Sequence, residues 1–350
     1  MPTNSSPKSA PKSPTIYDVA AKAGVSKSLV SLVVSGDIGV SDEKRKIVMS
    51  AIKELGYRPS KFAQQLAGGR TKTIGAIITD YKNLSFIGFL RGLREVADDA
   101  GFQVIISDLH NSPNFSDHAV SALMSMPVDG IVIAAEIPET QQLGITVPFV
   151  TIGDRTYVHP ESDLVRGDDG EGMRLAVEHL CSLGHRDIIH ITGYGGMSVK
   201  RKEAFVKFMS ERGLEAKVVG HGAPTTEIGG YLVVKEILDN GETCTAISTT
   251  NDAQAAGVLA ALKERNIRVP EDISVIGYDN SPITSEYFLK LTTIDEMGIQ
   301  IGREAARVLL ERMNNEPRKA RTKISISPQL TVRATTAKPK PKPRIKKTSS

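Results

Sequence analysis

The chain has 350 residues, of which 40% are hydrophobic and 24% are charged, as in an ordinary globular protein. A chain of this length buries a substantial core, and we expect it to form two or three folded units. Its sequence lacks an apolar run of the roughly 18 residues that a membrane helix needs. The Ser- and Pro-rich start lacks the apolar segment of a secretory signal, so we expect a cytoplasmic protein with no membrane partner.

Charge is unevenly distributed along the chain. Residues 1–70 contain 11 Lys or Arg and 5 Asp or Glu, a net charge of +6, and residues 338–350 carry another +6. Because the whole chain has a net charge of +4, the part between them carries −8. Basic ends on an acidic body favour a polyanion as the partner of the ends. Tails that only improve solubility explain the charge equally well.

The two cysteines, Cys181 and Cys244, lie far apart in the sequence and belong to no metal-binding or redox motif. This usage fits a reducing cytoplasm and argues against a disulfide framework or a metal site. We expect both to be buried as small hydrophobic residues, and we expect the protein to use neither a metal nor a cofactor.

The N-terminal part predicts a small all-α domain. Residues 1–14 are rich in Ser, Pro and Lys and are expected to be disordered. Residues 15–59 contain three short helical patterns. The first pattern opens at Thr15, where Asp18 makes a near capping box, and it ends at Gly24.

The other two helical patterns complete this domain. The second opens at Ser26, a good N-cap residue. Its apolar side consists of Leu29, Val30 and Val33. The third opens at Ser41, and Gly56 is its stop. Its apolar stripe consists of Ile47, Val48, Ala51, Ile52 and Leu55.

Residues 60–70 form a predicted hinge helix. Pro59 disfavours continuation of the third helix. Ser60 can cap a brief helix over residues 61–67, and two glycines end it. Because so short a segment is not stably helical alone, we expect it to fold only when something holds it.

From Thr73 onward, strand-like apolar runs alternate with amphipathic helices, which predicts parallel doubly wound α/β sheets. The predicted strands are 74–78, 104–106, 130–134, 149–152, 188–192, 246–248 and 274–277. The predicted helices are 86–100, 171–183, 200–212, 229–238, 253–265 and 298–313. So many units indicate two lobes rather than one sheet.

The two lobes are expected within residues 71–334, as one larger domain that the resemblance described below implies to be the effector-binding and dimerisation domain. The N-lobe is placed at about 71–165 and 297–323, and the C-lobe at about 166–296 and 324–334. Residues 335–350 are predicted to be a disordered, extended, basic tail.

The second helix of the small domain has the properties of a recognition helix, which enters the major groove of DNA. Lys27 can donate to guanine, Ser28 can bond either base type, and Leu32 offers an apolar contact such as one with a thymine methyl. Ser26 and the amides of the helix N-terminus can bind phosphate. A small helical domain with ordinary surface lysines is the alternative.

The N-terminal stretch, residues 15–75, resembles the start of the LacI/GalR family of bacterial repressors. The motifs that carry the resemblance are YDVA, AGVS, AIKELGY and RPSKFAQQLAGGRT. The resemblance continues through the body in VDGIVI (128–133), AVEHL (176–180), VPEDISVIGYDN (269–280) and SPQLTVR (327–333). Only the two tails fall outside it.

The resemblance implies a homodimer, with a tetramer possible, bound to a near-palindromic operator in the double-stranded DNA of a bacterial nucleoid. The paired hinge helices would enter the minor groove, where Leu66 would wedge into the central base step; a plain helix–helix contact is the alternative for Leu66. The implied DNA contacts are Ser26, Lys27, Ser28, Ser31, Leu32, Tyr17, Ser41, Arg45, Ser60, Gln64, Leu66 and Ala67.

Two residues of this region depart from the family pattern. Leu32 stands where much of the family has Arg, which should shift the operator preference. Ser60 stands where the family usually has Asn, and it remains a capping residue.

The body resembles periplasmic sugar-binding proteins, in which a ligand lies between two lobes at the carboxyl ends of strands. The implied effector contacts are Asp80, Phe86, Arg155, Arg201, Asn251 and Asp279. Asp accepts hydrogen bonds from sugar hydroxyls and Arg donates a fork of them. A sugar or polyol is the effector class that the family resemblance implies. Helix caps, a salt bridge between the lobes for Arg155 and a core position for Phe86 are the alternatives.

Two other classes of protein are weighed against a regulator. An exported binding protein shares the body fold but lacks a segment like residues 15–70. An enzyme would need a nucleophile, and Cys181 lies near His179 and His185, but these histidines belong to a family pattern that is typical of structure. We therefore expect a transcriptional repressor without catalytic activity, whose effector shifts an equilibrium between two lobe arrangements.

Overall fold

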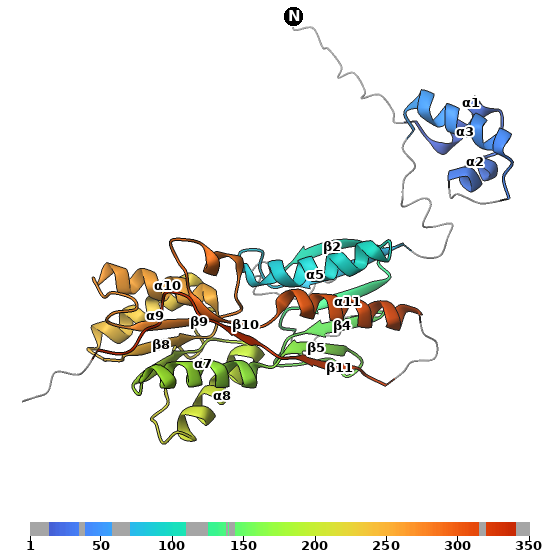
Figure 1. The fold of residues 1–350 in the computed structure, drawn as a ribbon. Helices are drawn as coiled ribbons and strands as arrows, with labels where there is room; N and C mark the ends of the chain where they lie inside the picture. The colour runs from blue at the N-terminus through green and yellow to red at the C-terminus, as the bar shows by residue number, and fades with distance from the viewer. Residues whose placement is uncertain are drawn as a thin grey trace, which may run out of the picture. The chain divides into compact units, whose positions relative to one another are not determined.

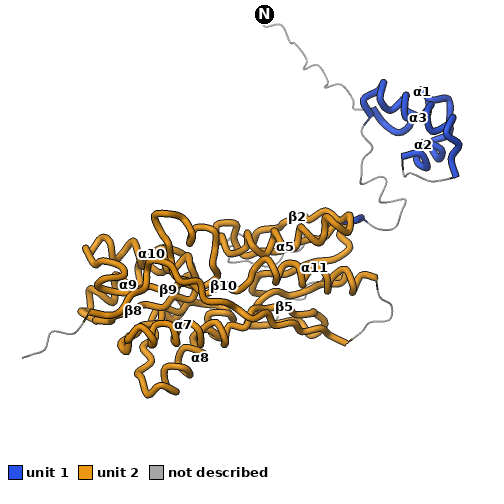
Figure 2. Tube along the Cα trace, in the orientation of Figure 1, with its two compact units in different colours: residues 1–72 blue, residues 73–350 orange. Residues whose placement is uncertain are grey.

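The computed structural model describes residues 14–34, 39–57, 71–109, 125–137, 139, 144–314 and 320–340. Figure 2 shows two compact units, residues 1–72 and residues 73–350, and each is described here by itself. The predicted hinge helix lies outside the described residues, and with it Ser60, Gln64, Leu66 and Ala67.

The smaller unit contains the three expected helices, α1 (Ile16–Ala23), α2 (Lys27–Val34) and α3 (Asp42–Leu55) (Figure 1). The capping box at the start of α1 is confirmed. The Thr15 hydroxyl accepts a hydrogen bond from the Asp18 amide, and the Asp18 carboxylate accepts one from the Thr15 amide at 2.7 Å. Gly24 ends α1 with a φ of 65°, which favours glycine.

The core of the smaller unit is built mainly from valines. Val19, Val30 and Val48, one from each helix, have no exposed surface. Burying side chains of this size stabilises the unit by about 1.5–3 kcal/mol each. One prediction is wrong: Ile47 is 45% exposed, so it lies beside the apolar stripe of α3 rather than in it.

The first sheet of the larger unit has six strands in the order β11-β5-β4-β3-β1-β2, and each neighbouring pair is parallel. Their bounds are β1 (Thr73–Ile78), β2 (Gln103–Asp108), β3 (Gly130–Ala134), β4 (Phe149–Ile152), β5 (Asp163–Gly167) and β11 (Lys323–Ile326). β1 and β3 are buried throughout, which explains their continuous apolar sequences.

The second sheet also has six strands, in the order β12-β10-β9-β8-β6-β7, and only β12 runs antiparallel to its neighbour. The bounds are β6 (Ile188–Ile191), β7 (Lys217–Val219), β8 (Ala246–Thr249), β9 (Ser274–Tyr278), β10 (Thr292–Asp295) and β12 (Gln329–Thr331). The predicted class, two doubly wound parallel sheets behind a small helical domain, is confirmed.

Helices pack against both sheets of the larger unit (Figure 1). They are α5 (Ser85–Asp99), α7 (Asp169–Leu183), α8 (Gly196–Ser210), α9 (Glu227–Asp239), α10 (Asp252–Glu264) and α11 (Gly298–Asn314), with a 3-10 turn, η1 (Pro282–Ser285). Helices α5 and α11 cross closely at Gly92. A Cβ at this position would lie 1.9 Å from the carbonyl oxygen of Ile299, so the crossing requires glycine.

Three segments of chain join the two lobes. β5 leads into α7, β10 leads into α11, and β11 leads into β12. The strands that flank these crossovers were not predicted, because sequences such as DLVRG and TTID are short and carry charged or hydroxyl residues.

The predicted disorder of the basic tail is wrong for residues 335–340, which lie along the second lobe. The Thr335 hydroxyl donates to the Val275 carbonyl at 2.7 Å, and Thr335 is buried. Side chains of the lobe hold the segment further along, since His185 bonds the Ala337 carbonyl at 2.8 Å and Lys340 pairs with Asp272. These bonds to the second lobe therefore order residues 335–340, although a sequence rich in Lys and Pro favours an extended, disordered segment. Residues 341–350 lie outside the described residues.

Candidate functional site

The polar face of α2 and the start of α1 form one exposed surface of the smaller unit. Lys27 and Ser28 are exposed, Ser31 is half-buried, and Leu32 is 41% exposed. The Ser26 hydroxyl caps the helix by accepting a hydrogen bond from the Leu29 amide at 3.2 Å. The side chains expected to meet DNA on α2 are thus accessible to a partner.

Tyr17 and Lys27 hold each other in place on this surface. The ammonium group of Lys27 donates to the Tyr17 hydroxyl at 3.3 Å and lies 5.0 Å from the centre of its ring. Tyr17 is 64% exposed. At the start of α3, Ser41 is exposed and its side chain makes no cap, while Arg45 is half-buried. The structure therefore presents these four residues on the unit's surface.

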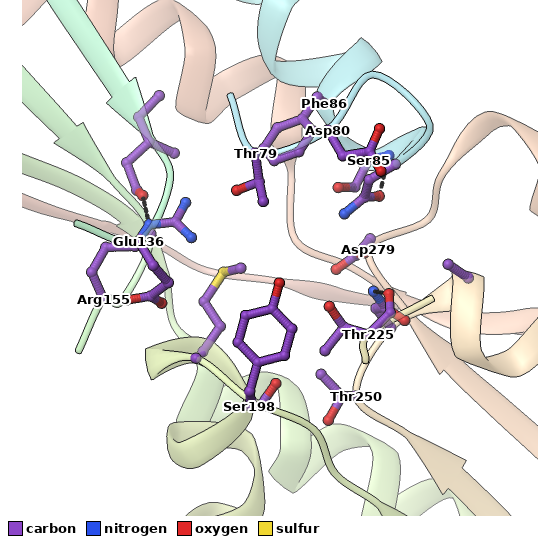
Figure 3. Close-up of a pocket in the computed structure, with 18 of the residues that line it drawn as sticks. Thr79, Asp80, Ser85, Phe86, Glu136, Arg155, Ser198, Thr225, Thr250 and Asp279 are labelled. Atoms are coloured by element: carbon purple, nitrogen blue, oxygen red, sulfur yellow. Dashed lines mark hydrogen bonds between the residues drawn. The ribbon is translucent and has the colours of Figure 1, made fainter. Parts of the chain in front are cut away.

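A cavity of about 810 Å³ lies between the two lobes of the larger unit. Its lining comes from the carboxyl ends of strands in both sheets, where ligands of open α/β folds bind. Figure 3 shows Asp80 and Phe86 facing Thr225, Thr250 and Asp279 around the open space. All six predicted effector residues line this one cavity: Asp80, Phe86, Arg155, Arg201, Asn251 and Asp279.

Arg201 is 1% exposed and is held by the protein itself. Its guanidinium donates to Asp169 at 2.7 Å, to Asp279 at 3.0 Å and to the Thr250 carbonyl at 2.6 Å. A longer hydrogen bond of 3.4 Å joins the guanidinium to the Glu296 carboxylate, and the guanidinium carbon lies 3.6 Å from the centre of the Tyr278 ring. Arg201 therefore fixes the carboxylates of Asp169, Asp279 and Glu296, which form the floor of the cavity. Each of these three side chains is more exposed than that of Arg201.

Burial changes the acidity of these carboxylates. It raises the pKa of Asp279 to about 8, although Arg201 favours the charged form, and the negative charge of Asp252 adds to the rise. Burial and the charge of Asp279 together raise the pKa of Glu296 to about 8. The pKa of Asp169 is raised too, by burial. Burial of these acid groups thus outweighs the charge of Arg201 and, at Glu296, that of Arg155, both of which favour the ionised forms.

Asp279 also has an unusual backbone. Its φ is 109°, a region that residues with a Cβ rarely adopt. Such strain costs of the order of 1–3 kcal/mol and tends to occur at ligand-binding positions. The turn after β9 thereby aims the Asp279 carboxylate at Arg201 and the cavity.

Glu136 bridges the two lobes at another part of the lining. It follows β3 in the first lobe, and its carboxylate accepts hydrogen bonds from the amides of Gly196 at 2.7 Å and Thr156 at 2.9 Å. Gly196 begins α8 in the second lobe, so the carboxylate also meets the positive end of a helix. A Cβ on Gly196 would lie 2.3 Å from the Arg155 carbonyl carbon, so only glycine permits this approach.

The other predicted effector residues have structural partners as well. Asn251 caps α10 by accepting from the Gln254 amide at 2.9 Å, and its amide group donates to the Thr225 carbonyl. Asp80 accepts from the Lys82 amide at 2.8 Å. Arg155 donates through Nε to the Ile152 carbonyl, so this bond stays within the first lobe. Phe86 both lines the cavity and packs on the core.

Sequence reasoning missed several lining residues, among them Asp169 and Glu136. Asp169 follows β5, so the rule that selected Asp80 and Asp279 would have found it had that strand been predicted. Glu136 follows a predicted strand, but its partner Gly196 is 60 residues further on, and no local pattern pairs them.

The histidines and cysteines that could belong to an enzyme have structural roles. His179 bonds the Thr336 hydroxyl at 2.9 Å, and His185 bonds Thr245 and Ala337, so both anchor the C-terminal segment. Burial lowers the pKa of both rings and so favours their neutral forms. Cys181 and Cys244 are partly exposed rather than buried as expected, and burial raises the pKa of the Cys244 thiol to about 12.

Within the described residues, no group of three or more His, Cys, Asp or Glu side chains has an arrangement that could hold a metal ion. None of the helices described in the structure has both the length and the apolarity to cross a membrane.

Comparison with known proteins identifies the family. Residues 15–60 match the model "Bacterial regulatory proteins, lacI family", and residues 177–336 match a "Periplasmic binding protein-like domain". The HTH-type transcriptional repressor PurR of Mannheimia succiniciproducens is 31% identical over 332 residues, which are 93% of this chain and 99% of the relative. The chain belongs to the LacI family.

Solved LacI-family structures are similar over most of the chain. The lac repressor dimer, bound to operator and the anti-inducer ONPF, has a TM-score of 0.80 at 28% identity and covers 93% of this chain and 100% of its own. A regulator from Enterococcus faecalis with bound ribose has a TM-score of 0.68 at 29% identity and covers 76% of this chain and 99% of its own. The protein is thus a DNA-binding transcriptional regulator of the LacI family.

Proposed function

We propose that this LacI-family regulator is a repressor that binds a near-palindromic operator as a homodimer and responds to a sugar or polyol. The observation that carries the proposal is the cavity between the lobes, whose polar lining comes from strand ends of both sheets. A ligand that contacts both lobes favours one arrangement of them, and it shifts DNA affinity by the difference in its binding to the two.

A neutral, hydroxyl-rich effector is supported by the lining and by a relative. The acceptors Asp80, Asp279 and Glu296, together with the aromatic face of Phe86, suit hydroxyls on one side and C–H groups on the other. The similar regulator from Enterococcus faecalis holds ribose.

The homodimer is supported by exposed apolar side chains on the larger unit. Ile228 and Leu232 lie on one side of α9 and are 60% and 55% exposed, and Tyr287 and Phe288 after η1 are 87% and 77% exposed. Such residues favour a protein interface. The similar lac repressor is a dimer on its operator, so we assign these surfaces to a second copy of the chain.

A thermal-melting screen tests the sensor half of the proposal. The full chain would be melted with sugars, polyols, sugar phosphates and purines, each at millimolar concentration. A binder raises the melting temperature in a dose-dependent way by mass action. No shift with any compound would count against a small-molecule sensor of these classes.

Replacing Lys27 by Ala tests the DNA half. Loss of one donor on the recognition helix should weaken operator binding at least tenfold, because a good contact to a base edge is worth about 1–3 kcal/mol. The operator would be found by selection from random duplexes, and affinity would be measured by fluorescence anisotropy. Tyr17→Phe, which removes only the hydroxyl that holds Lys27, should have a smaller effect in the same direction.

Lys53→Ala is the matched control for that measurement. It removes the same charge from an exposed position on α3 in the same unit. Equal losses for Lys27→Ala and Lys53→Ala would mean that only the overall charge matters, and the assignment of α2 as the reading helix would be abandoned.

A further inference from the structure

The first turn of α8 is capped by a residue of the other lobe. Three other helices of the second lobe, α7, α9 and α10, each have an N-cap residue whose side chain accepts an amide hydrogen bond: Asp168, Thr226 and Asn251. Helix α8 follows Gly195 instead, which makes no side-chain cap. The Gly196 amide donates to the Glu136 carboxylate at 2.7 Å, so the first lobe supplies the missing cap.

The backbone on both sides fits this contact. Glu136 is half-buried and also accepts from the Thr156 amide at 2.9 Å, which fixes the carboxylate within its own lobe. A Cβ on Gly195 would lie 3.1 Å from a carboxylate oxygen of Glu136, and one on Gly196 would lie 2.5 Å from the Thr156 nitrogen. Two successive glycines therefore let the start of α8 approach the first lobe closely enough for the hydrogen bond to form.

Charge favours the same contact. A carboxylate at a helix N-terminus meets the positive end of the helix dipole, and a hydrogen bond to a charged acceptor is stronger than a neutral one. Arg155 lies on the same side of the cavity as Glu136 (Figure 3), and the charge of Glu136 opposes the lowering of the Arg155 pKa by burial. Away from the crossover segments, the bond from Gly196 to Glu136 is the one hydrogen bond between described residues that joins the two lobes.

We propose that Glu136 is an interlobe latch, which holds the lobes together over the cavity and sets the operator affinity of the chain before an effector acts. The cap exists only while the lobes meet, so capping of α8 and closure of the lobes are one equilibrium. Weakening the cap shifts that equilibrium toward separated lobes. The link to DNA rests on the proposed function, in which the arrangement of the lobes controls operator affinity.

Amide hydrogen exchange of the full chain tests the latch. In Glu136→Ala the Val199 amide, which donates to the Gly195 carbonyl and not to Glu136, should exchange about tenfold faster, because loss of a cap loosens the first turn. Glu136→Gln retains an acceptor oxygen without the charge and should lie between. The Ala255 amide in the first turn of α10, whose cap is Asn251, should be unaffected.

Glu139→Ala is the matched control for the exchange measurement. Glu139 lines the same cavity, is exposed, and has no hydrogen bond to another described residue. Its replacement should leave exchange at Val199 unchanged. Equal exchange at Val199 in wild type and Glu136→Ala would overturn the latch.

Charge reversal tests closure and its effect on DNA. Glu136→Lys places a cation beside Arg155 and at the positive end of α8, while Glu139→Lys makes the same change of net charge at an exposed position. Small-angle scattering should give a larger radius of gyration for Glu136→Lys than for Glu139→Lys. Operator affinity, measured by anisotropy, should differ between the two by about threefold or more, and its sign identifies the lobe arrangement that binds DNA.

Each outcome decides one part of the inference. Equal radii would refute closure by Glu136, and unequal radii with equal operator affinities would refute its control of DNA binding. If Glu136→Lys does not fold, Glu136→Ala and Glu139→Ala decide the same comparisons. A wild-type chain that binds no selected duplex would refute the proposed regulator instead, and exchange and scattering would still decide the latch.

Discussion

Replacing Arg201 by Met is expected to destabilise the larger unit by about 3–5 kcal/mol, because it leaves buried carboxylates without their cation. Asp169 and Asp279 would lose hydrogen bonds of 2.7 and 3.0 Å. Urea unfolding followed by circular dichroism measures the change at pH 8. Arg174→Met removes an arginine from ion pairs on the surface of α7 and should cost under about 1 kcal/mol.

The loss of unfolding free energy caused by Arg201→Met should become smaller as the pH is lowered from 8 to 6. Arg201 lowers the pKa values of Asp279 and Glu296 from the higher values that burial alone would give, so its removal should raise them above about 8. Ionising these groups near pH 8 therefore destabilises the folded variant more than the folded wild type, whereas at pH 6 both proteins hold them protonated. A deficit equal to that of Arg174→Met, or independent of pH, would mean that the cluster is held by other contacts.

Replacing Gly196 by Ala is expected to disfavour the closed contact between the lobes. The added Cβ would lie 2.3–2.6 Å from backbone atoms of Arg155 and Thr156, and backbone cannot move aside as a side-chain end can. Overpacking of this kind costs about 1–3 kcal/mol, so the lobes should separate in an appreciable fraction of molecules. Hydrogen exchange of the Thr156 amide, which now donates to Glu136, should become about tenfold faster.

Gly88→Ala is the control for this substitution. It also adds one methyl to the first turns of a helix in the same unit, but its nearest neighbour would be at 3.6 Å, an ordinary contact. Small-angle scattering should show a larger radius of gyration for Gly196→Ala and no change for Gly88→Ala. Unchanged exchange at Thr156 in Gly196→Ala would show that the lobes adapt without parting.

The sequence was sufficient for the fold class and for the general position of the site. Long apolar runs such as residues 74–78 and 130–134 predict buried parallel strands, and the rule that ligands bind at strand ends selects Asp80 and Asp279. Both residues line the cavity. These features were predictable because they depend on local periodicity or on which residue follows a strand.

What could not be predicted depends on contacts between distant segments. The pairing of Glu136 with Gly196 and the bonds of His179 and His185 to residues 336 and 337 join parts of the chain that no local pattern connects. The saturation of Arg201 by three carboxylates is of the same kind. Resemblance singled out Arg201, but only the structure shows that its donors are directed at protein groups.

Two of the crossovers between the lobes carry acids of the cavity floor. Asp169 begins α7 directly after β5, and Glu296 lies between β10 and α11, while their shared partner Arg201 belongs to α8 in the second lobe. Rotation of one lobe against the other changes the distances within this cluster, and with them the number of bound protons. If effector binding rotates the lobes, protons and the effector are therefore coupled by the same free energy in both directions.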